Sequence, residues 1–181
     1  MTAELKNRLT ALAEEIVKYG KKYIVLHYVG ANSDTAGKTV KWWHTVSLGW
    51  KKAGYHQFMN WDGTIEEIEP TNTVVNGMSA GWGRNREWTE NAFQLCFETV
   101  NKDLRLHPEQ AEAILFLIKE VLKRNPNVLI GGHREFPDLS WRGYRGRQNT
   151  SCPGFSVSDW LVANGVKREN CFYFAYNGGA R

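Results

Sequence analysis

The sequence has few cysteines and no long apolar run, and both absences narrow the class of protein. Three cysteines are an odd number without the spacing of a disulfide framework, so we expect no disulfide scaffold and at least one free thiol. Residues 1–19 mix charges with spaced apolar residues and contain no apolar core of the signal-peptide type. No stretch has the length of a transmembrane helix. The sequence therefore predicts a protein made in the cytoplasm without a classical signal peptide and without membrane insertion.

Strong net charge and internal repeats are also missing. The formal net charge is +4, which suits an anionic polymer but is too small to indicate nucleic acid by itself. The acidic run Glu66-Glu67-Ile68-Glu69 also argues against a nucleic-acid partner. We find no low-complexity linker, and 181 residues are most simply one domain with a substantial core.

The first part of the chain predicts two helices separated by a strand. Apolar residues recur at helical spacing before Gly20, namely Leu5, Leu9, Leu12 and Ile16. We expect residues 1–21 to form an N-terminal helix packed on a domain of residues 22–181. The short β-branched run 22–28 predicts a buried strand. Residues 40–50 predict a helix with three residues on or near its inner face, Trp42, Trp43 and Val46.

The rest of the chain alternates strands and helices. Asp62-Gly63 between the strand-like runs 55–61 and 64–69 favours a hairpin, because glycine accepts positive φ at no steric cost. Further elements are a surface loop (72–90), a central strand (93–100), a helix (108–124), a short strand (128–130), a helix capped by Ser156, and a terminal strand or tail (172–176). This order predicts an α/β fold, a single domain with a mixed β-sheet flanked by helices.

Two histidines and one cysteine make a candidate zinc site. His27 ends the first predicted strand, His133 follows Gly131-Gly132, and Cys152 lies in a Cys-Pro-Gly turn of a polar loop. Three protein ligands leave a fourth position for water, which is typical of catalytic zinc. Each histidine taken alone is more simply a satisfied core or surface residue. Cys152 is either a metal ligand or a reactive nucleophile.

The remaining histidines and cysteines have simpler interpretations. We interpret His44 as a packing residue within a Trp-rich helix, and His107, just before Pro108, as a helix cap or surface residue. Cys96 falls in the predicted central strand, where a buried and inert thiol is the usual case. Cys171 has no partner that the sequence identifies.

Five blocks of sequence occur in an order that resembles a known family. They are Val25-Leu26-His27-Tyr28, Gly54-Tyr55-His56-Gln57-Phe58, Trp61-Asp62-Gly63-Thr64, Gly132-His133-Arg134-Glu135 and Thr150-Ser151-Cys152-Pro153-Gly154. The chain is similar in these blocks to the zinc N-acetylmuramoyl-L-alanine amidases, a family that includes amidase-type phage lysozymes and peptidoglycan recognition proteins. The resemblance covers about residues 22–161 and implies an amidase-like fold with Zn²⁺ as cofactor.

The resemblance also implies roles for single residues. The zinc ligands it implies are His27, His133 and Cys152. Tyr55 becomes a catalytic helper whose hydroxyl can donate a hydrogen bond to the developing oxyanion. Thr150 falls where some members have a catalytic lysine and where recognition-protein amidases often have threonine. His56 neighbours the site in the family motif, and we expect it to contact substrate.

The sequence departs from some relatives at two positions. Ser79 takes the place of a histidine in Gly77-Met78-Ser79-Ala80, and we keep it as a candidate substrate contact. Cys96 takes the place of a glutamate base found in other members. Glu98 points to the same strand face if the strand is regular, which makes it a candidate substitute for that base. A solvated or salt-bridged glutamate is the simpler interpretation.

Two loops carry further candidate substrate contacts. The loop 141–147 joins two predicted zinc ligands and is basic and aromatic, so we expect Arg145 or Arg147 to contact stem-peptide carboxylates. Trp82 in the loop 82–86 is a weaker candidate for the opposite wall of a groove. A solvated surface loop is the simpler alternative for both segments.

The resemblance predicts a zinc-dependent hydrolase that cleaves the amide between N-acetylmuramic acid and L-alanine of peptidoglycan. We expect a monomeric phage-type endolysin, bacteriolytic and antimicrobial, that is released to the cell wall by another factor. The alternative is a non-catalytic peptidoglycan-binding recognition module. Such members typically lose the cysteine ligand, so the presence of Cys152 argues against this alternative.

Overall fold

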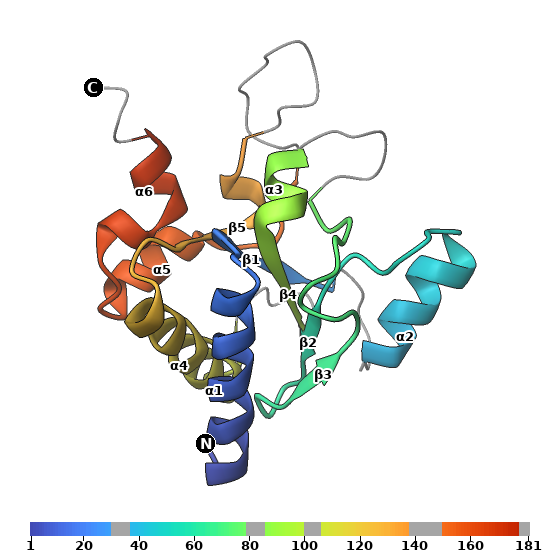
Figure 1. The fold of residues 1–181 in the computed structure, drawn as a ribbon, viewed down its shortest axis with the longest axis horizontal. Helices are drawn as coiled ribbons and strands as arrows, with labels where there is room; N and C mark the ends of the chain where they lie inside the picture. Colours follow the sequence, from blue (N-terminus) through green and yellow to red (C-terminus); the bar gives the residue numbers. More distant parts are fainter. Residues whose placement is uncertain (30–36, 79–85, 100–105, 138–149, 178–181) are drawn as a thin grey trace.

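A five-stranded mixed sheet forms the centre of the protein (Figure 1). The computed structural model describes residues 1–29, 37–78, 86–99, 106–137 and 150–177. The strands are β1 (Tyr23–Tyr28), β2 (Gln57–Met59), β3 (Ile65–Glu67), β4 (Ala92–Phe97) and β5 (Leu129–Gly132), in the spatial order β3-β2-β4-β1-β5. Strands β2, β4, β1 and β5 run parallel, and β3 pairs antiparallel with β2. The predicted α/β class and mixed sheet are confirmed.

Helices flank this sheet. The described helices are α1 (Ala3–Lys18), α2 (Gly37–Trp42), α3 (Arg86–Asn91), α4 (Pro108–Arg124), α5 (Val157–Ala163) and α6 (Phe172–Asn177). Shorter turns are the π-helical η1 (Trp43–Ser47) and the 3-10 turns η2 (His133–Glu135) and η3 (Arg168–Asn170). Within the described segments, no helix combines the length and apolarity needed to span a bilayer.

One face of the sheet packs against the two long helices. Helices α1 and α4 lie side by side below the sheet in Figure 1. Alternate strand residues point toward them, and the main core cluster includes Ile24 and Leu26 of β1 with Phe93 and Leu95 of β4. Leu9 of α1 belongs to the same cluster and is fully buried. The first helix is therefore part of the main hydrophobic core.

The opposite face of the sheet carries the polar side chains. Strand residues alternate between the two faces, so the side chain of His27 in β1 points away from α1 and α4, on the face opposite to Ile24 and Leu26. Gln94 and Cys96 of β4 lie on the same face as His27. The register pairs His27 with Cys96 across the two central strands. This face therefore brings a histidine, a glutamine and a cysteine together at the middle of the sheet.

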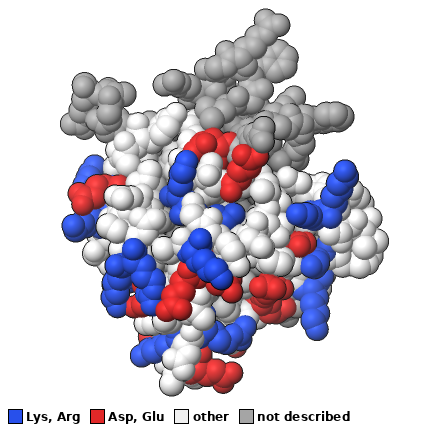
Figure 2. All heavy atoms as spheres, in the orientation of Figure 1, with Lys and Arg blue, Asp and Glu red and all other residues white. Residues whose placement is uncertain are grey.

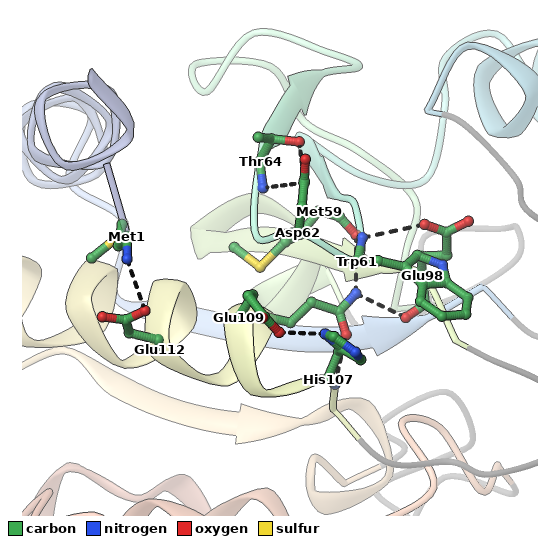
Figure 3. A network of polar contacts seen from close by, with 10 residues as sticks. Met1, Met59, Trp61, Asp62, Thr64, Glu98, His107, Glu109 and Glu112 are labelled. Atoms are coloured by element: carbon green, nitrogen blue, oxygen red, sulfur yellow. Dashed lines mark hydrogen bonds and ion pairs between the residues drawn. The ribbon is translucent and has the colours of Figure 1, made fainter. Parts of the chain in front are cut away.

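The β2–β3 hairpin is confirmed and is held by its turn residues (Figure 3). Asp62 Oδ1 accepts hydrogen bonds from the Thr64 amide at 2.9 Å and the Thr64 hydroxyl at 2.6 Å. Gly63 has φ +79°, and a Cβ there would lie 2.7 Å from the carbonyl oxygen of Glu109. Glycine is therefore required both for the turn and for its close approach to α4.

The helix predicted over 40–50 differs from the structure. α2 begins at Gly37 and ends at Trp42, and a π-helical turn continues to Ser47. The buried residues of this segment are Gly37, Val40 and His44. Three residues expected on the inner face are exposed, namely Trp42 (57%), Trp43 (49%) and Val46 (62%). The apolar residues correctly predicted a helix here, but the largest side chains of this short helix lie on its solvent-exposed side.

Two other sequence predictions are wrong at the element level. Residues 172–176, expected to be extended, form helix α6, and Phe172 stacks on Phe136 with ring centroids 3.8 Å apart. The loop predicted over 72–90 contains the start of α3 at Arg86. In contrast, the strand predicted over 22–28 and the helix predicted over 108–124 are confirmed, with His107 as the N-cap of the helix.

Candidate metal centre

Three side chains from distant parts of the chain converge at one end of the parallel strands. His27 lies near the end of β1, His133 opens η2 directly after β5, and Cys152 lies in the loop before α5. Their ligand atoms all lie within 4.8 Å of one another. The two histidine rings are 4.8 Å apart between centroids. Because β1 and β5 are parallel neighbours, both histidines emerge at the same edge of the sheet.

The distance between two of these atoms fits a tetrahedral zinc ion. His27 Nδ1 lies 3.6 Å from Cys152 Sγ. A tetrahedral ion with Zn–N near 2.0–2.1 Å and Zn–S near 2.3 Å places those two atoms about 3.5 Å apart. Two imidazole nitrogens and one thiolate are also donors that zinc prefers. The donor set, and the distance between His27 and Cys152, therefore fit zinc with three protein ligands.

Burial sets the protonation of the ligands. His27 is 1% exposed, and burial, with the neighbouring His133, lowers its pKa well below the ordinary value. A neutral imidazole can coordinate a metal without first losing a proton. Burial raises the pKa of Cys152 to about 12, so without a metal this residue is a neutral thiol. Coordination as a thiolate therefore requires the metal to displace the thiol proton.

The loop of Cys152 is bound to the turn that carries His133. The Arg134 amide donates to the Cys152 carbonyl at 2.8 Å. A Cβ on Gly132 would lie 2.6 Å from Pro153, so glycine allows the two segments to pack closely. The Glu135 carboxylate accepts hydrogen bonds from the Gly132 amide at 3.1 Å and from the hydroxyl of Ser158, the second residue of α5, at 2.8 Å. These contacts fix the relative positions of two candidate ligands.

Tyr55 lies beside the candidate ligands. Its ring centroid is 5.0 Å from that of His27. Burial raises the pKa of Tyr55 well above its ordinary value, with smaller contributions from Cys96 and Cys152. The hydroxyl therefore keeps its proton and can donate a hydrogen bond. Cys96 is fully buried, and burial likewise raises the pKa of its thiol well above the ordinary value.

His44 is a packing residue, as expected. It is 3% exposed, stacks on Trp50 with ring centroids 4.6 Å apart, and accepts a hydrogen bond from the Gly54 amide at 3.1 Å through Nδ1. Its ring centroid also lies 5.3 Å from that of Tyr55. The segment after α2 therefore supports the position of Tyr55.

Thr150 and His56 have hydrogen-bonding roles within the protein. Thr150 Oγ1 accepts the amide hydrogen of Cys152 at 3.1 Å and so shapes the turn of the cysteine. His56 is fully buried, and its two ring nitrogens bond the Gln94 amide and the Thr73 carbonyl, each at 2.9 Å. The substrate contact expected of His56 does not fit this position, because the ring has no exposed surface and both nitrogens have protein partners.

The other predicted substrate contacts, Ser79, Trp82, Arg145 and Arg147, lie outside the residues that the structure describes. Glu98 is described, and it is neither solvated nor placed as a free carboxylate. It is 7% exposed, and its Oε2 accepts the amide hydrogen of Trp61 at 3.3 Å (Figure 3). This contact directs the carboxylate toward the β2–β3 hairpin.

Sequence reasoning missed two residues that support the candidate ligands. Gln94 Oε1 lies 2.6 Å from His27 Nε2, and Glu135 braces the turn of His133 as described above. A signal for Gln94 was present, because it is a polar residue in the middle of an otherwise apolar strand. Glu135 lay within a recognised block but had no role assigned to it.

A single α/β domain with two histidines and one cysteine at a strand edge defines a candidate metallohydrolase. The profile of the N-acetylmuramoyl-L-alanine amidase family matches residues 18–155, well over half of the chain. The chain belongs to this family, whose characteristic reaction is the hydrolysis of an amide in peptidoglycan. A comparison with curated protein sequences finds no match.

Solved structures share the fold. The endolysin amidase LysCS from Clostridium intestinale is 21% identical with a TM-score of 0.61, over 82% of this chain and 86% of that one. The Ph2119 endolysin from a Thermus scotoductus bacteriophage is 22% identical with a TM-score of 0.60, over 81% and 86%. Drosophila peptidoglycan recognition protein LB is 16% identical with a TM-score of 0.59, over 83% and 85%. Endolysins and recognition proteins thus both have this fold.

Proposed function

We propose that the protein is a zinc-dependent peptidoglycan hydrolase that cleaves the amide between N-acetylmuramic acid and L-alanine. The observation that carries the proposal is the convergence of His27, His133 and Cys152, whose ligand atoms lie within 4.8 Å of one another. Family membership supplies the bond to be cleaved. The three ligands come from different segments of the chain, so chance proximity along the sequence does not explain their meeting.

Each site residue has a defined task in this proposal. His27, His133 and Cys152 would hold the zinc ion. When bound, zinc supplies a Lewis acid for the amide carbonyl and lowers the pKa of its water to about 7. The Tyr55 hydroxyl, which its raised pKa keeps protonated, donates to the oxygen on which negative charge develops.

Thr150 is the second residue that we assign to catalysis. Its oxygen accepts the Cys152 amide hydrogen, which leaves the hydroxyl proton to donate to a substrate oxygen. Ser79, Trp82, Arg145 and Arg147 stay proposals for substrate contact. Arginine suits stem-peptide carboxylates because its guanidinium can bind them through two parallel hydrogen bonds.

A recognition module without catalysis is the second candidate, since recognition proteins share the fold. The complete ligand set favours the enzyme, because a binding module has no need of a thiolate ligand. We further propose a monomeric phage-type endolysin with bacteriolytic, antimicrobial action at the cell wall. The similarity in fold to the Ph2119 endolysin supports this setting.

Digestion of purified peptidoglycan tests the assigned reaction. We expect new L-alanine amino termini without new reducing sugar ends, and loss of both solubilisation and new termini after treatment with a chelator. Zinc added back should restore them. Release of reducing sugars, or full cleavage in the chelated protein, would contradict the assignment. Binding to peptidoglycan without any new termini would favour the recognition module.

A further inference from the structure

Gln94 is a polar side chain in the most buried part of the sheet. It lies in β4, every residue of which is buried, and is itself 0% exposed. An amide removed from water is unfavourable unless its polar atoms find hydrogen-bonding partners. The partners of Gln94 therefore indicate what this residue does.

The Gln94 amide joins a candidate ligand to a backbone carbonyl. Its Nε2 donates to the carbonyl of Trp88 at 3.5 Å, and its Oε1 lies 2.6 Å from His27 Nε2. The Trp88 carbonyl can only accept, so the amide nitrogen faces Trp88 and the amide oxygen faces the imidazole. An amide oxygen also can only accept. His27 must therefore carry its proton on Nε2.

This tautomer leaves the lone pair of His27 on Nδ1. Nδ1 is the nitrogen that lies 3.6 Å from Cys152 Sγ, on the side of the candidate metal centre. The opposite tautomer would place a proton where the metal has to bind. It would also set the Nε2 lone pair against the Gln94 oxygen, an unfavourable contact between two acceptors.

The surrounding backbone holds Gln94 in place. Its amide donates to His56 Nδ1 at 2.9 Å, and its carbonyl accepts from the His56 amide at 2.9 Å. Gly77 packs against the side-chain amide, since a Cβ there would lie 3.3 Å from Gln94 Oε1 and 2.4 Å from the Gly54 carbonyl oxygen. Gln94 is thus held on both its main chain and its side chain.

We propose that Gln94 is a positioning residue that fixes the tautomer and ring orientation of His27 for the metal. The inference rests on the proposed zinc function, but it concerns only the protonation and orientation of one ligand and not the reaction. Gln94 acts through His27 and contacts no substrate. Outer partners of this kind typically change metal affinity by about 10–100-fold when removed.

Gln110 provides a matched control. It is 1% exposed, its Oε1 accepts from the His107 amide at 3.0 Å, and its Nε2 donates to the Glu98 carbonyl at 3.0 Å. It is therefore a buried, hydrogen-bonded glutamine like Gln94, but its partners are backbone atoms of His107, Met59 and Glu98, and none of these is a candidate ligand. A purely structural role of Gln94 would make the two residues equivalent in a metal-binding measurement.

The experiment measures zinc affinity by competition with a chromophoric chelator for wild type, Gln94→Met, Gln94→Glu and Gln110→Met. We expect Gln94→Met to weaken zinc binding about 10–100-fold. Gln110→Met should leave the affinity unchanged, and Gln94→Glu, which keeps an acceptor, should restore most of the affinity. Equal zinc affinity in wild type and Gln94→Met, or equal loss in the two methionine variants, would overturn the proposal.

A second measurement needs no substitution. In the metal-free wild type, ¹⁵N spectra of the imidazole rings should show the His27 proton on Nε2, in slow exchange with water because the ring is buried. A proton on Nδ1 would overturn the proposal even if the protein binds zinc and cleaves peptidoglycan. Absence of zinc binding in wild type would instead count against the proposed function, so the two failures are distinguishable.

Discussion

His27 shows how the fold prepares a single side chain for a metal. Its position on β1 buries the ring and lowers its pKa, so the imidazole is neutral near pH 7 and competes with no proton. Cys152 is the opposite case, because burial raises its pKa to about 12 and stabilises the thiol against the thiolate. The imidazole of His27 can therefore coordinate a metal as it stands, whereas the Cys152 thiol must first lose its proton. The thiol becomes a charged thiolate only when the metal binds.

Tyr55→Phe removes only the phenolic hydroxyl from the site. If that hydroxyl stabilises the developing oxyanion, the substitution should lower kcat by about 10²–10³-fold. Zinc content should stay the same, because Tyr55 is not assigned as a ligand. Steady-state cleavage and metal analysis of the same preparation test this. Tyr176→Phe, at a position 39% exposed, is the matched control and should change neither quantity. A drop in the zinc content of Tyr55→Phe would contradict this prediction, because it would mean that Tyr55 supports metal binding and not the reaction.

His56 predicts how stability depends on pH. Burial lowers its pKa to about 3, whereas in the unfolded chain it is near 6.5. The unfolded state binds the extra proton between these values, so the free energy of unfolding falls as pH decreases from 6.5 toward 3. Between pH 7 and pH 5 this residue alone predicts a loss of about 2 kcal/mol, to which His27 adds in the metal-free protein.

Urea unfolding of the chelated protein at several pH values measures this dependence. His56→Gln removes the titrating group, and the variant should lose less stability than wild type over the same pH range. An identical pH slope in wild type and His56→Gln would show that the buried imidazole does not set the acid sensitivity.

At the scale of elements, the alternation of strand residues separates stability from chemistry. Residues of β1 and β4 that face α1 and α4 are apolar, including Ile24 and Phe93, and belong to the main core cluster. Residues on the other face include His27 and Gln94, which bond one another. A change in the packing of the two long helices should therefore affect folding much more than the metal centre.

Leu9→Ala tests this separation. Leu9 is fully buried between α1 and the rest of the core, so its truncation should lower the free energy of unfolding by about 2–5 kcal/mol. Leu48→Ala, at a position 45% exposed, should change stability by less than about 0.5 kcal/mol. Denaturant unfolding gives both values. Zinc affinity of folded Leu9→Ala should match wild type, and a large loss of affinity would mean that the two faces are coupled.

Patterns of regular spacing allowed the best predictions of the fold. The 108–124 helix has a proline at its start and a continuous apolar stripe, and the structure places it at those residues. The stretch 40–50 has no such stripe, and its tryptophans drew the prediction to the wrong face. Helix α6 was missed because its aromatic residues suit a strand equally well, and only contacts such as Phe172 with Phe136 decide between them.

The candidate site shows the same limit. The resemblance to a family grouped His27, His133 and Cys152, and the structure brings them together. The resemblance does not predict contacts between distant segments, such as the one between Gln94 and His27, because no local spacing links residues on different strands. His56 was misassigned for a related reason, since its neighbour Tyr55 faces the site while His56 itself is enclosed.

At the scale of the whole molecule, the metal centre ties together three remote parts of the chain. His27 comes from β1, His133 follows β5, and Cys152 precedes α5. In the unfolded chain these ligands are far apart, so zinc binding is coupled to the folded state. Acidic and basic side chains are interspersed over the described part of the face shown in Figure 2, in keeping with the mild net charge of +4.

The most direct test of the central claim is metal analysis paired with counting of new L-alanine termini, for wild type, Cys152→Ser and Cys171→Ser. Cys171 is also a buried free cysteine, and its Sγ contacts the Lys167 carbonyl, so it controls for the loss of a thiol. We predict one zinc per chain and cleavage in wild type and Cys171→Ser, with both lost together in Cys152→Ser. Undiminished zinc content and cleavage in Cys152→Ser would contradict the account.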